Sequence, residues 1–102
     1  MPKGEIRLRT AEGHLNQLAD RMRMRRRSLK MTQEAFCGRI ASVSEGLWVP
    51  ARMDVVRIEN GGRIVSDLEI LTLAKALACS ACWLLTGEGD LAPPKLSPAN
   101  QS

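Results

Sequence analysis

The stretch from Thr32 to Gly61 reads TQEAFCGRIASVSEGLWVPARMDVVRIENG, and it contains two helix signals separated by a turn signal. Thr32 is a residue type that caps helices, because its hydroxyl accepts a hydrogen bond from an amide of the first turn. The apolar residues Phe36, Cys37 and Ile40 then recur at helical spacing. This pattern predicts a short helix from Gln33 to about Ala41.

A second helix is predicted over residues 52–59. Pro50 prevents a helix from continuing through it, because proline lacks an amide hydrogen and clashes with the preceding turn. Residues 60–62 read Asn-Gly-Gly and end the helix, since glycine readily adopts the left-handed conformation of a C-cap. We interpret residues 42–50 as a long connection, part of which can extend the preceding helix.

Helical patterns also flank this pair of helices. We predict a helix from about residue 12 to residue 28. Its inward stripe consists of Leu15, Leu18, Met22 and Leu29, and Arg23, Arg27 and Lys30 share the opposite face.

Two more helices are predicted after the glycines. Residues 66–69 read Ser-Asp-Leu-Glu, which is a capping box at the start of a helix that runs from about 67 to 78. Its inward stripe consists of Leu68, Leu71, Ala74 and Leu77. Ser80 caps a fifth helix that continues through Leu85 and ends at Gly87.

These signals predict an all-α fold, a compact bundle of five short helices. A length of 102 residues provides for one domain. We expect a flexible N-terminal arm over residues 1–11, the helical domain over residues 12–90 and a disordered tail over residues 91–102, where three prolines occur.

The net charge of +4 is unevenly distributed. Residues 1–30 carry nine basic and three acidic side chains, whereas residues 31–102 carry six basic and eight acidic ones. The basic excess is greatest at Arg21, Arg23, Arg25, Arg26, Arg27 and Lys30. A positive end on a small domain indicates a polyanionic partner, most often nucleic acid, and a solvated helix face is the alternative.

The composition offers little for catalysis. One histidine and no tyrosine are present, and no phosphate loop, nucleophile–base pair or paired carboxylates occur. Cys79 and Cys82 have CxxC spacing, but structural zinc takes four ligands, and Cys37 and His14 are distant in sequence. We therefore expect no enzyme activity, no cofactor and no metal, with the thiols at core positions.

Reduced thiols and the lack of a secretion signal favour a cytoplasmic location. No apolar run approaches the ~18 residues that a membrane helix needs, so no membrane association is expected.

The order of the motifs resembles the helix-turn-helix domain of the phage repressor and Cro-like family, also called the XRE family. The matching segments are Arg21-Met22-Arg23 with Arg26, residues 29–37 (LKMTQEAFC), residues 55–61 (VVRIENG), the leucine pattern of 68–77, and residues 82–87 (CWLLTG). The resemblance covers about residues 18–88. It implies a lambda-repressor-like fold that binds double-stranded DNA sequence-specifically in a bacterial or phage transcriptional regulator, most often a repressor.

The resemblance also implies site residues. The helix 52–59 would read base edges in the major groove, and the helix that begins at Gln33 would cross the backbone. The implied DNA-binding residues are Thr32, Gln33, Arg52, Met53, Asp54, Arg57, Asn60 and Arg63. Arg26 and Glu59 resemble a structural ion pair of the family.

Three of these assignments have alternatives. On the face of this helix, Arg52 is the natural partner of a guanine edge. Asp54, which is implied to share that face, can equally cap its own helix. Gln33 is implied to meet phosphate and can also be an ordinary surface residue. Asn60 can be a C-cap only.

The connection departs from the family pattern. Fourteen positions separate Cys37 from Ala51, about eight more than is usual in the family. A longer-turn subgroup also has a tryptophan ahead of the reading helix, which Trp48 resembles. We expect Trp48 and Leu47 to pack this turn onto the domain. A reading helix that begins at Ser44 is disfavoured, because it would contain a glycine and a proline.

A homodimer is expected, because one half-site offers too little surface for tight binding. The segment from Trp83 to Leu91 is the candidate interface, and Met24 is a further candidate contact with a second subunit. The same domain type occurs in antitoxins, so a toxin partner or another role as a protein-interaction module is the alternative function.

Overall fold

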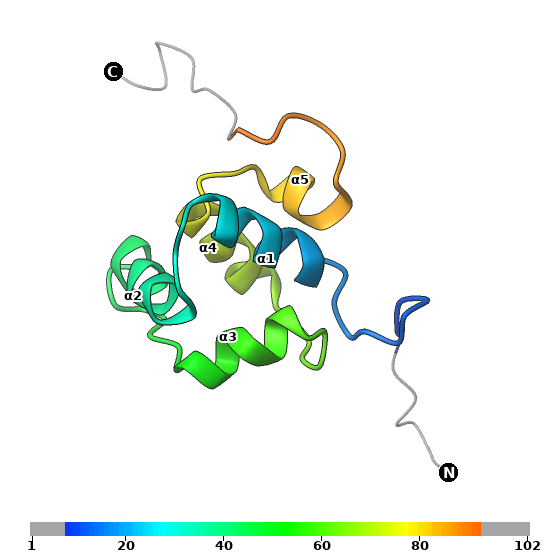
Figure 1. The fold of residues 1–102 in the computed structure, drawn as a ribbon, viewed down its shortest axis with the longest axis horizontal. Helices are drawn as coiled ribbons and strands as arrows, with labels where there is room; N and C mark the ends of the chain where they lie inside the picture. The colour runs from blue at the N-terminus through cyan, green and yellow to red at the C-terminus, as the bar shows by residue number, and fades with distance from the viewer. Residues whose placement is uncertain (1–7, 93–102) are drawn as a thin grey trace.

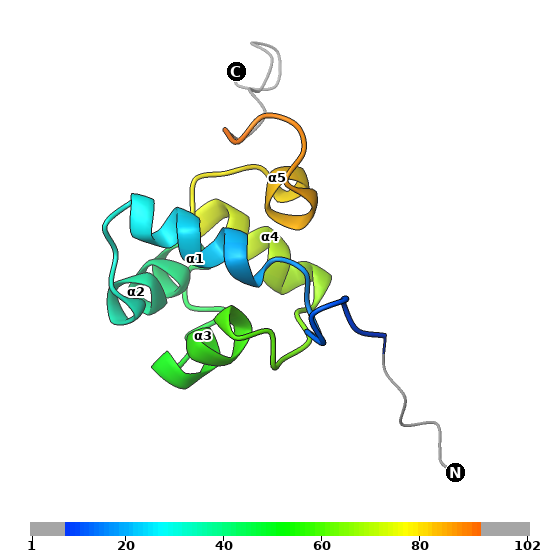
Figure 2. The same cartoon turned by 45° about the vertical axis from the view of Figure 1, so that its right-hand side comes forward.

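The computed structural model describes residues 8–92, and within them every regular element is an α-helix. The helices are α1 (Ala19–Ser28), α2 (Gln33–Val43), α3 (Arg52–Glu59), α4 (Asp67–Ala76) and α5 (Ala81–Thr86). In Figure 1, α1 crosses the middle of the molecule, α3 forms its lower edge and α5 lies above. The view in Figure 2 shows α4 behind α1. The expected all-α bundle is confirmed.

All five helices, or the residues at their ends, contribute to one core. The largest fully buried side chains are Phe36, Leu18, Met22, Ile40, Ile58, Leu73, Leu77, Leu84 and Val55. Burial of a side chain of this size contributes about 1.5–3 kcal/mol, so this shared core holds the short helices together. Of the apolar residues predicted at helical spacing in α2, Phe36 and Ile40 are fully buried and Cys37 packs against the core.

The first helix is shorter than predicted. Residues 12–18 are not helical, and α1 begins at Ala19. Gly13 has a φ of +87°, and the Leu15 amide donates to the carbonyl of Gly61 (2.7 Å) rather than to a helical partner. Tertiary hydrogen bonds therefore replace the predicted first turns. At the other end, Leu29 is exposed instead of inward, since it follows the last residue of α1.

The inward stripe of α4 also differs from the prediction. Leu68 and Leu71 are 73% and 60% exposed, whereas Leu73 and Leu77 are fully buried. A spacing of three residues drifts by about 60° per step around a helix that turns about 100° per residue. A stripe that is inward at Leu77 therefore faces solvent at Leu68.

Helix ends depend on left-handed residues that are not all glycine. Lys30, Glu45 and Ala78 have φ values of +59°, +54° and +51° after α1, α2 and α4. The Cys79 amide donates to the carbonyl of Ala74 (3.0 Å), which closes the end of α4 two residues before the predicted position.

The long turn ends at α3 as predicted. Helix α2 extends to Val43, and the residues between it and Arg52 are not helical. Trp48 packs against the core, and the Ser44 hydroxyl accepts a hydrogen bond from its amide (3.1 Å). Leu47, however, is 91% exposed, so its predicted packing role is wrong.

Part of each predicted terminal segment lies outside the described residues, namely 1–7 of the arm and 93–102 of the tail. At the described end, the carbonyl of Leu91 accepts a hydrogen bond from the Ser80 amide (2.8 Å), beside the start of α5. None of the helices over residues 8–92 has the length and apolar character to cross a bilayer.

Candidate nucleic-acid interface

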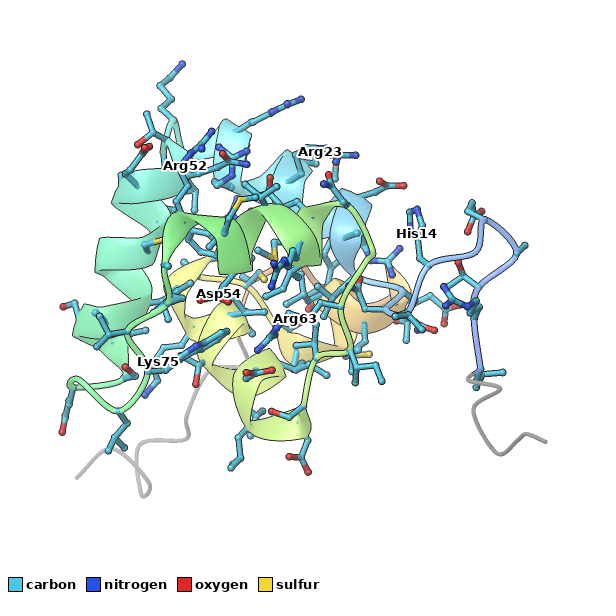
Figure 3. The ribbon with its side chains drawn as sticks, turned by 90° about the horizontal axis from the view of Figure 1, so that it is seen from below. His14, Arg23, Arg52, Asp54, Arg63 and Lys75 are labelled. Atoms are coloured by element: carbon cyan, nitrogen blue, oxygen red, sulfur yellow. The ribbon has the colours of Figure 1, made fainter. Side chains whose placement is uncertain are left out.

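Helix α3 has a buried face and an exposed face. Val55, Ile58 and Glu59 are buried against the rest of the molecule. The exposed residues are Arg52, Met53, Arg57 and Asn60. Figure 3 views the molecule from this side, with α3 in front of the other helices. Four of the eight predicted DNA-binding residues thus share one open surface.

The start of α3 is organised by Asp54. The Asp54 carboxylate accepts a hydrogen bond from the Ala51 amide (2.9 Å), so the side chain closes the first turn of its own helix. Of the two interpretations of Asp54, the capping role is the one observed. Arg52 remains exposed, and its Nε lies 3.5 Å from a carboxylate oxygen of Glu34 on α2. Such an exposed ion pair contributes about 0–1 kcal/mol, so Arg52 can exchange this partner readily.

Helix α3 ends at the Asn-Gly-Gly segment, as the sequence predicted. Asn60 is the C-cap residue, Gly61 has a φ of +75°, and the Gly62 amide donates to the carbonyl of Arg57 (2.9 Å). A Cβ at Gly61 would collide with the imidazole of His14. Gly61 is therefore required for its conformation and for the close approach of the N-terminal segment.

The predicted structural ion pair is present and shielded. Arg26 and Glu59 are 6% and 3% exposed, and two hydrogen bonds of 2.6 and 3.0 Å join the guanidinium to the carboxylate. Arg26 also donates to the carbonyl of Met31 (2.7 Å). Gln33 Nε2 lies 3.2 Å from a Glu59 oxygen and donates to it. This network ties α1, the start of α2 and the end of α3 together.

Gln33 is half-buried and bonded to Glu59, so it is not the ordinary surface residue of the alternative interpretation. Its side-chain amide is engaged with Glu59, whereas Thr32 is exposed and caps α2 by accepting from the Ala35 amide (3.0 Å). An anion at this end of α2 would therefore bind the Thr32 hydroxyl and the first backbone amides of the helix, and not the Gln33 side chain.

Arg63 is bound within the domain. It makes two hydrogen bonds to the carboxylate of Glu69 (3.1 and 2.7 Å), and its guanidinium carbon lies 5.9 Å from the centre of the Trp48 ring. The hydrogen bonds from Arg63 hold the pKa of Glu69 below its usual value. In Figure 3, Arg63 lies beyond one edge of α3, and Arg52 and Arg23 lie beyond the other.

Three arginines of α1 have a role that the sequence did not indicate. Each donates to carbonyl groups at the C-terminal end of another helix. Arg23 bonds the carbonyl of Glu59 (3.0 Å), Arg25 bonds those of Leu77 (2.9 Å) and Ala78 (3.2 Å), and Arg21 bonds those of Leu84 (2.8 Å) and Leu85 (2.7 Å). The last carbonyls of a helix lack partners within it and carry partial negative charge, so a guanidinium satisfies both needs.

Arg23 also forms an ion pair with Asp20 (2.8 Å), and its side chain is only 33% exposed. The prediction that Arg23 lies on an outward face opposite the core is therefore wrong. Arg27 and Lys30, in contrast, are exposed.

The cysteines occupy different environments. Cys79 is buried and Cys37 is half-buried against the core, and burial is the main cause that raises the pKa of each thiol. Cys82 is exposed, so the expectation of a core position is wrong for this thiol. Over residues 8–92, no group of three or more His, Cys, Asp or Glu side chains could hold a metal ion.

Comparisons with protein-family models, curated proteins and solved structures found no match.

Proposed function

We propose that this chain is a lambda-repressor-like helix-turn-helix protein of the XRE family, and that it binds double-stranded DNA through α3 as a bacterial or phage transcriptional regulator. The observation that carries the proposal is the division of α3 into a fixed face and an open face. The helix is held by its buried side chains, the Arg26–Glu59 pair and the Arg23 contact, while Arg52, Met53, Arg57 and Asn60 stay exposed.

The dimensions and chemistry of this face suit a major groove. Eight helical residues extend about 12 Å, which is similar to the width of the groove in B-form DNA. Arginine recognises the guanine edge with two parallel hydrogen bonds, and asparagine can recognise adenine in the same manner. Met53 adds an apolar surface of the kind that contacts a thymine methyl group.

Arg57 is the strongest candidate for a base contact. Within residues 8–92 its guanidinium group has no hydrogen-bond or ion-pair partner, whereas that of Arg52 lies near Glu34. Thr32 and the first amides of α2 would position the phosphate backbone, because the Arg52–Glu34 contact (3.5 Å) places the start of α2 beside the start of α3. Arg63 and Asp54 act within the domain in this proposal, because both are already bonded to it.

Selection of bound duplexes from a random pool tests the proposal. We expect enrichment of a consensus sequence. We also expect the logarithm of the affinity to fall by about 0.9 for each neutralised phosphate when the salt concentration rises tenfold. No enrichment, together with no salt-dependent binding, would refute DNA recognition and favour the protein-interaction alternative.

The named residues are then compared on a duplex that contains one half-site. Arg57→Ala and Arg52→Ala should each cost about 1–3 kcal/mol on the selected site and relax the preference at one base pair. Arg39→Ala is the matched control, because Arg39 is equally basic and exposed but lies on α2, where it donates to the carbonyl of Ala76 at the end of α4 (2.9 Å). An equal loss from all three substitutions would mean that α3 contributes charge only.

A further inference from the structure

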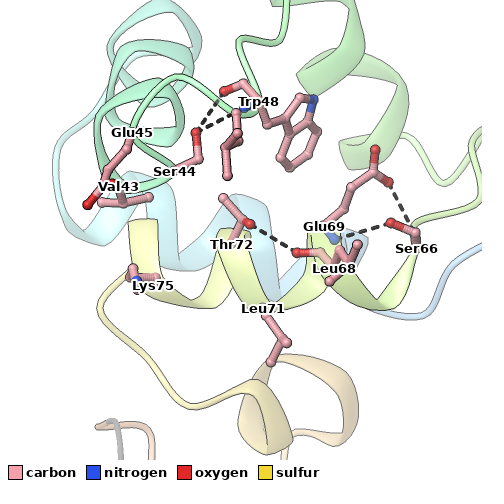
Figure 4. A pocket seen from close by; sticks show the side chains of 11 residues that line it. Val43, Ser44, Glu45, Trp48, Ser66, Leu68, Glu69, Leu71, Thr72 and Lys75 are labelled. Atoms are coloured by element: carbon pink, nitrogen blue, oxygen red, sulfur yellow. Dashed lines mark hydrogen bonds between the residues drawn. The ribbon is translucent and has the colours of Figure 1, made fainter.

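A groove lies between α4 and the turn that precedes α3. It has a volume of about 660 Å³, and Figure 4 looks into it with α4 across the middle, α3 above and α5 below. Leu47, Trp48, Leu68 and Leu71 contribute its apolar lining, and Thr72 and Lys75 lie toward the end of α4. We call the exposed residues Leu47, Asp67, Leu68, Leu71 and Lys75 the α4 face.

The α4 face is unusually apolar for an exposed surface. Leu47, Leu68 and Leu71 keep 91%, 73% and 60% of their surface exposed. Large apolar side chains that cluster on a surface mark an interaction site, because covering them removes apolar area from water. The energetic gain from such a cover is about 25 cal/mol for each Å² that is buried.

The charges on this face are arranged for a second copy of the same chain. Asp67 precedes Leu71 by four residues, and Lys75 follows it by four. In an antiparallel pair of α4 helices related by a two-fold axis at Leu71, the two Leu71 side chains meet and each Asp67 lies opposite the partner's Lys75. Among the described residues, neither Asp67 nor Lys75 has an ion-pair partner within its own chain.

We propose that the α4 face is the interface of a two-fold homodimer. This assignment replaces the expected interface at Trp83 to Leu91. It is argued from the exposed leucines and from the positions of Asp67 and Lys75. Its role, the pairing of two DNA-binding helices, rests on the proposed function. In Figure 4, α4 lies across the view and α3 lies above it. A two-fold axis that runs vertically in front of α4 therefore leaves the α3 helices of both copies above the two α4 helices. That is the arrangement a two-fold DNA site requires.

Sedimentation without DNA tests the interface on the full chain. Leu71→Lys places two like charges together on the axis, and we expect it to raise the dimer dissociation constant at least about tenfold. Met24→Lys is the matched control, because Met24 is 57% exposed on α1 and lies outside the α4 face. If Met24→Lys dissociates the dimer and Leu71→Lys does not, or if the unaltered chain stays monomeric at about 100 μM, the proposal is overturned.

A charge exchange provides a second test that does not depend on the apolar residues. Asp67→Lys and Lys75→Asp should each weaken the dimer, because each creates like charges across the axis. The double variant restores opposite charges and should restore dimerisation. Absence of this recovery would contradict the antiparallel register. Thermal melting of each variant verifies folding, since Asp67 also occupies the first turn of α4.

The two proposals fail separately. A chain that dimerises through Leu71 but ignores duplex DNA refutes the proposed function and leaves the interface intact. A chain that binds a half-site, while Leu71→Lys leaves its oligomeric state unchanged, refutes the interface and leaves DNA recognition intact.

Discussion

Removal of Glu59 should be the most destabilising change at the centre of this fold. The carboxylate accepts two hydrogen bonds from Arg26 and one from Gln33, and both charged side chains are less than one-tenth exposed. Glu59→Leu leaves the guanidinium buried without a counter-charge, which costs about 3–5 kcal/mol. In a domain of this size, that loss lowers the melting temperature by roughly 12–40 °C.

The companion variants separate the charge from the packing. Arg26→Met should cost a similar amount, because it leaves Glu59 unpaired. The double variant Arg26→Met, Glu59→Leu removes both charges and should recover at least about 3 kcal/mol relative to the sum of the single changes. Glu59→Gln is a milder variant that keeps acceptor and shape if Glu59→Leu does not fold.

Urea unfolding followed by far-ultraviolet circular dichroism measures these free energies. The reasoning is refuted if the single changes cost less than about 1 kcal/mol each, or if their effects simply add in the double variant. Either result would mean that the pair is effectively solvated and does not hold α3 against α1.

Other predictions concern single sites. Gly61→Ala should cost at least about 2 kcal/mol, because its φ is +75° and the new methyl group meets His14, whereas Gly38→Ala in the open interior of α2 should stabilise by about 0.5–1 kcal/mol. Urea unfolding of the two variants checks both signs. Because Arg63 lowers the pKa of Glu69 in the folded state, the contribution of Glu69 to stability is present above its usual pKa of about 4.3 and is lost as the pH falls through the lowered value. Melting temperatures measured from neutral to acidic pH should therefore fall less steeply in Glu69→Gln. A thiol reagent should label Cys82 at once and Cys79 only after unfolding, and equal native rates would contradict the burial of Cys79.

The sequence predicted the elements whose signals are local. Thr32, Ser66 and Ser80 cap their helices as expected, and Pro50 and Gly61 delimit α3. These residues act through hydrogen bonds or backbone conformations within a few positions of themselves, so the chain specifies them directly. The Arg26–Glu59 pair was available only from the family resemblance, since thirty-three positions separate its members.

The errors arose where distant contacts decide the local structure. Residues 12–18 have a helical pattern, but Asn16 donates to the carbonyls of Ile58 (3.1 Å) and Arg63 (2.9 Å), which the sequence cannot reveal. The stripe of α4 was misplaced because an apolar residue need not be inward, and Leu68 and Leu71 remain exposed. The predicted DNA contacts are not tested by the fold, although Asp54, Gln33 and Arg63 already have partners within it.

The arginines of α1 stabilise the fold through hydrogen bonds and also make the electrostatic potential around the domain more positive. A carbonyl group does not neutralise the guanidinium that bonds it, so Arg21, Arg23 and Arg25 still contribute to the positive potential around the domain. Their donors, however, are largely occupied by the ends of α5, α3 and α4. Under the proposed DNA binding, we therefore expect long-range attraction of the polyanion and short-range contact with it to come from different residues. Under the same proposal, we expect Arg23→Ala to weaken DNA binding indirectly, because Arg23 holds the carbonyl of Glu59 at the end of α3 (3.0 Å). A lower melting temperature that accompanies the lower DNA affinity would support this explanation.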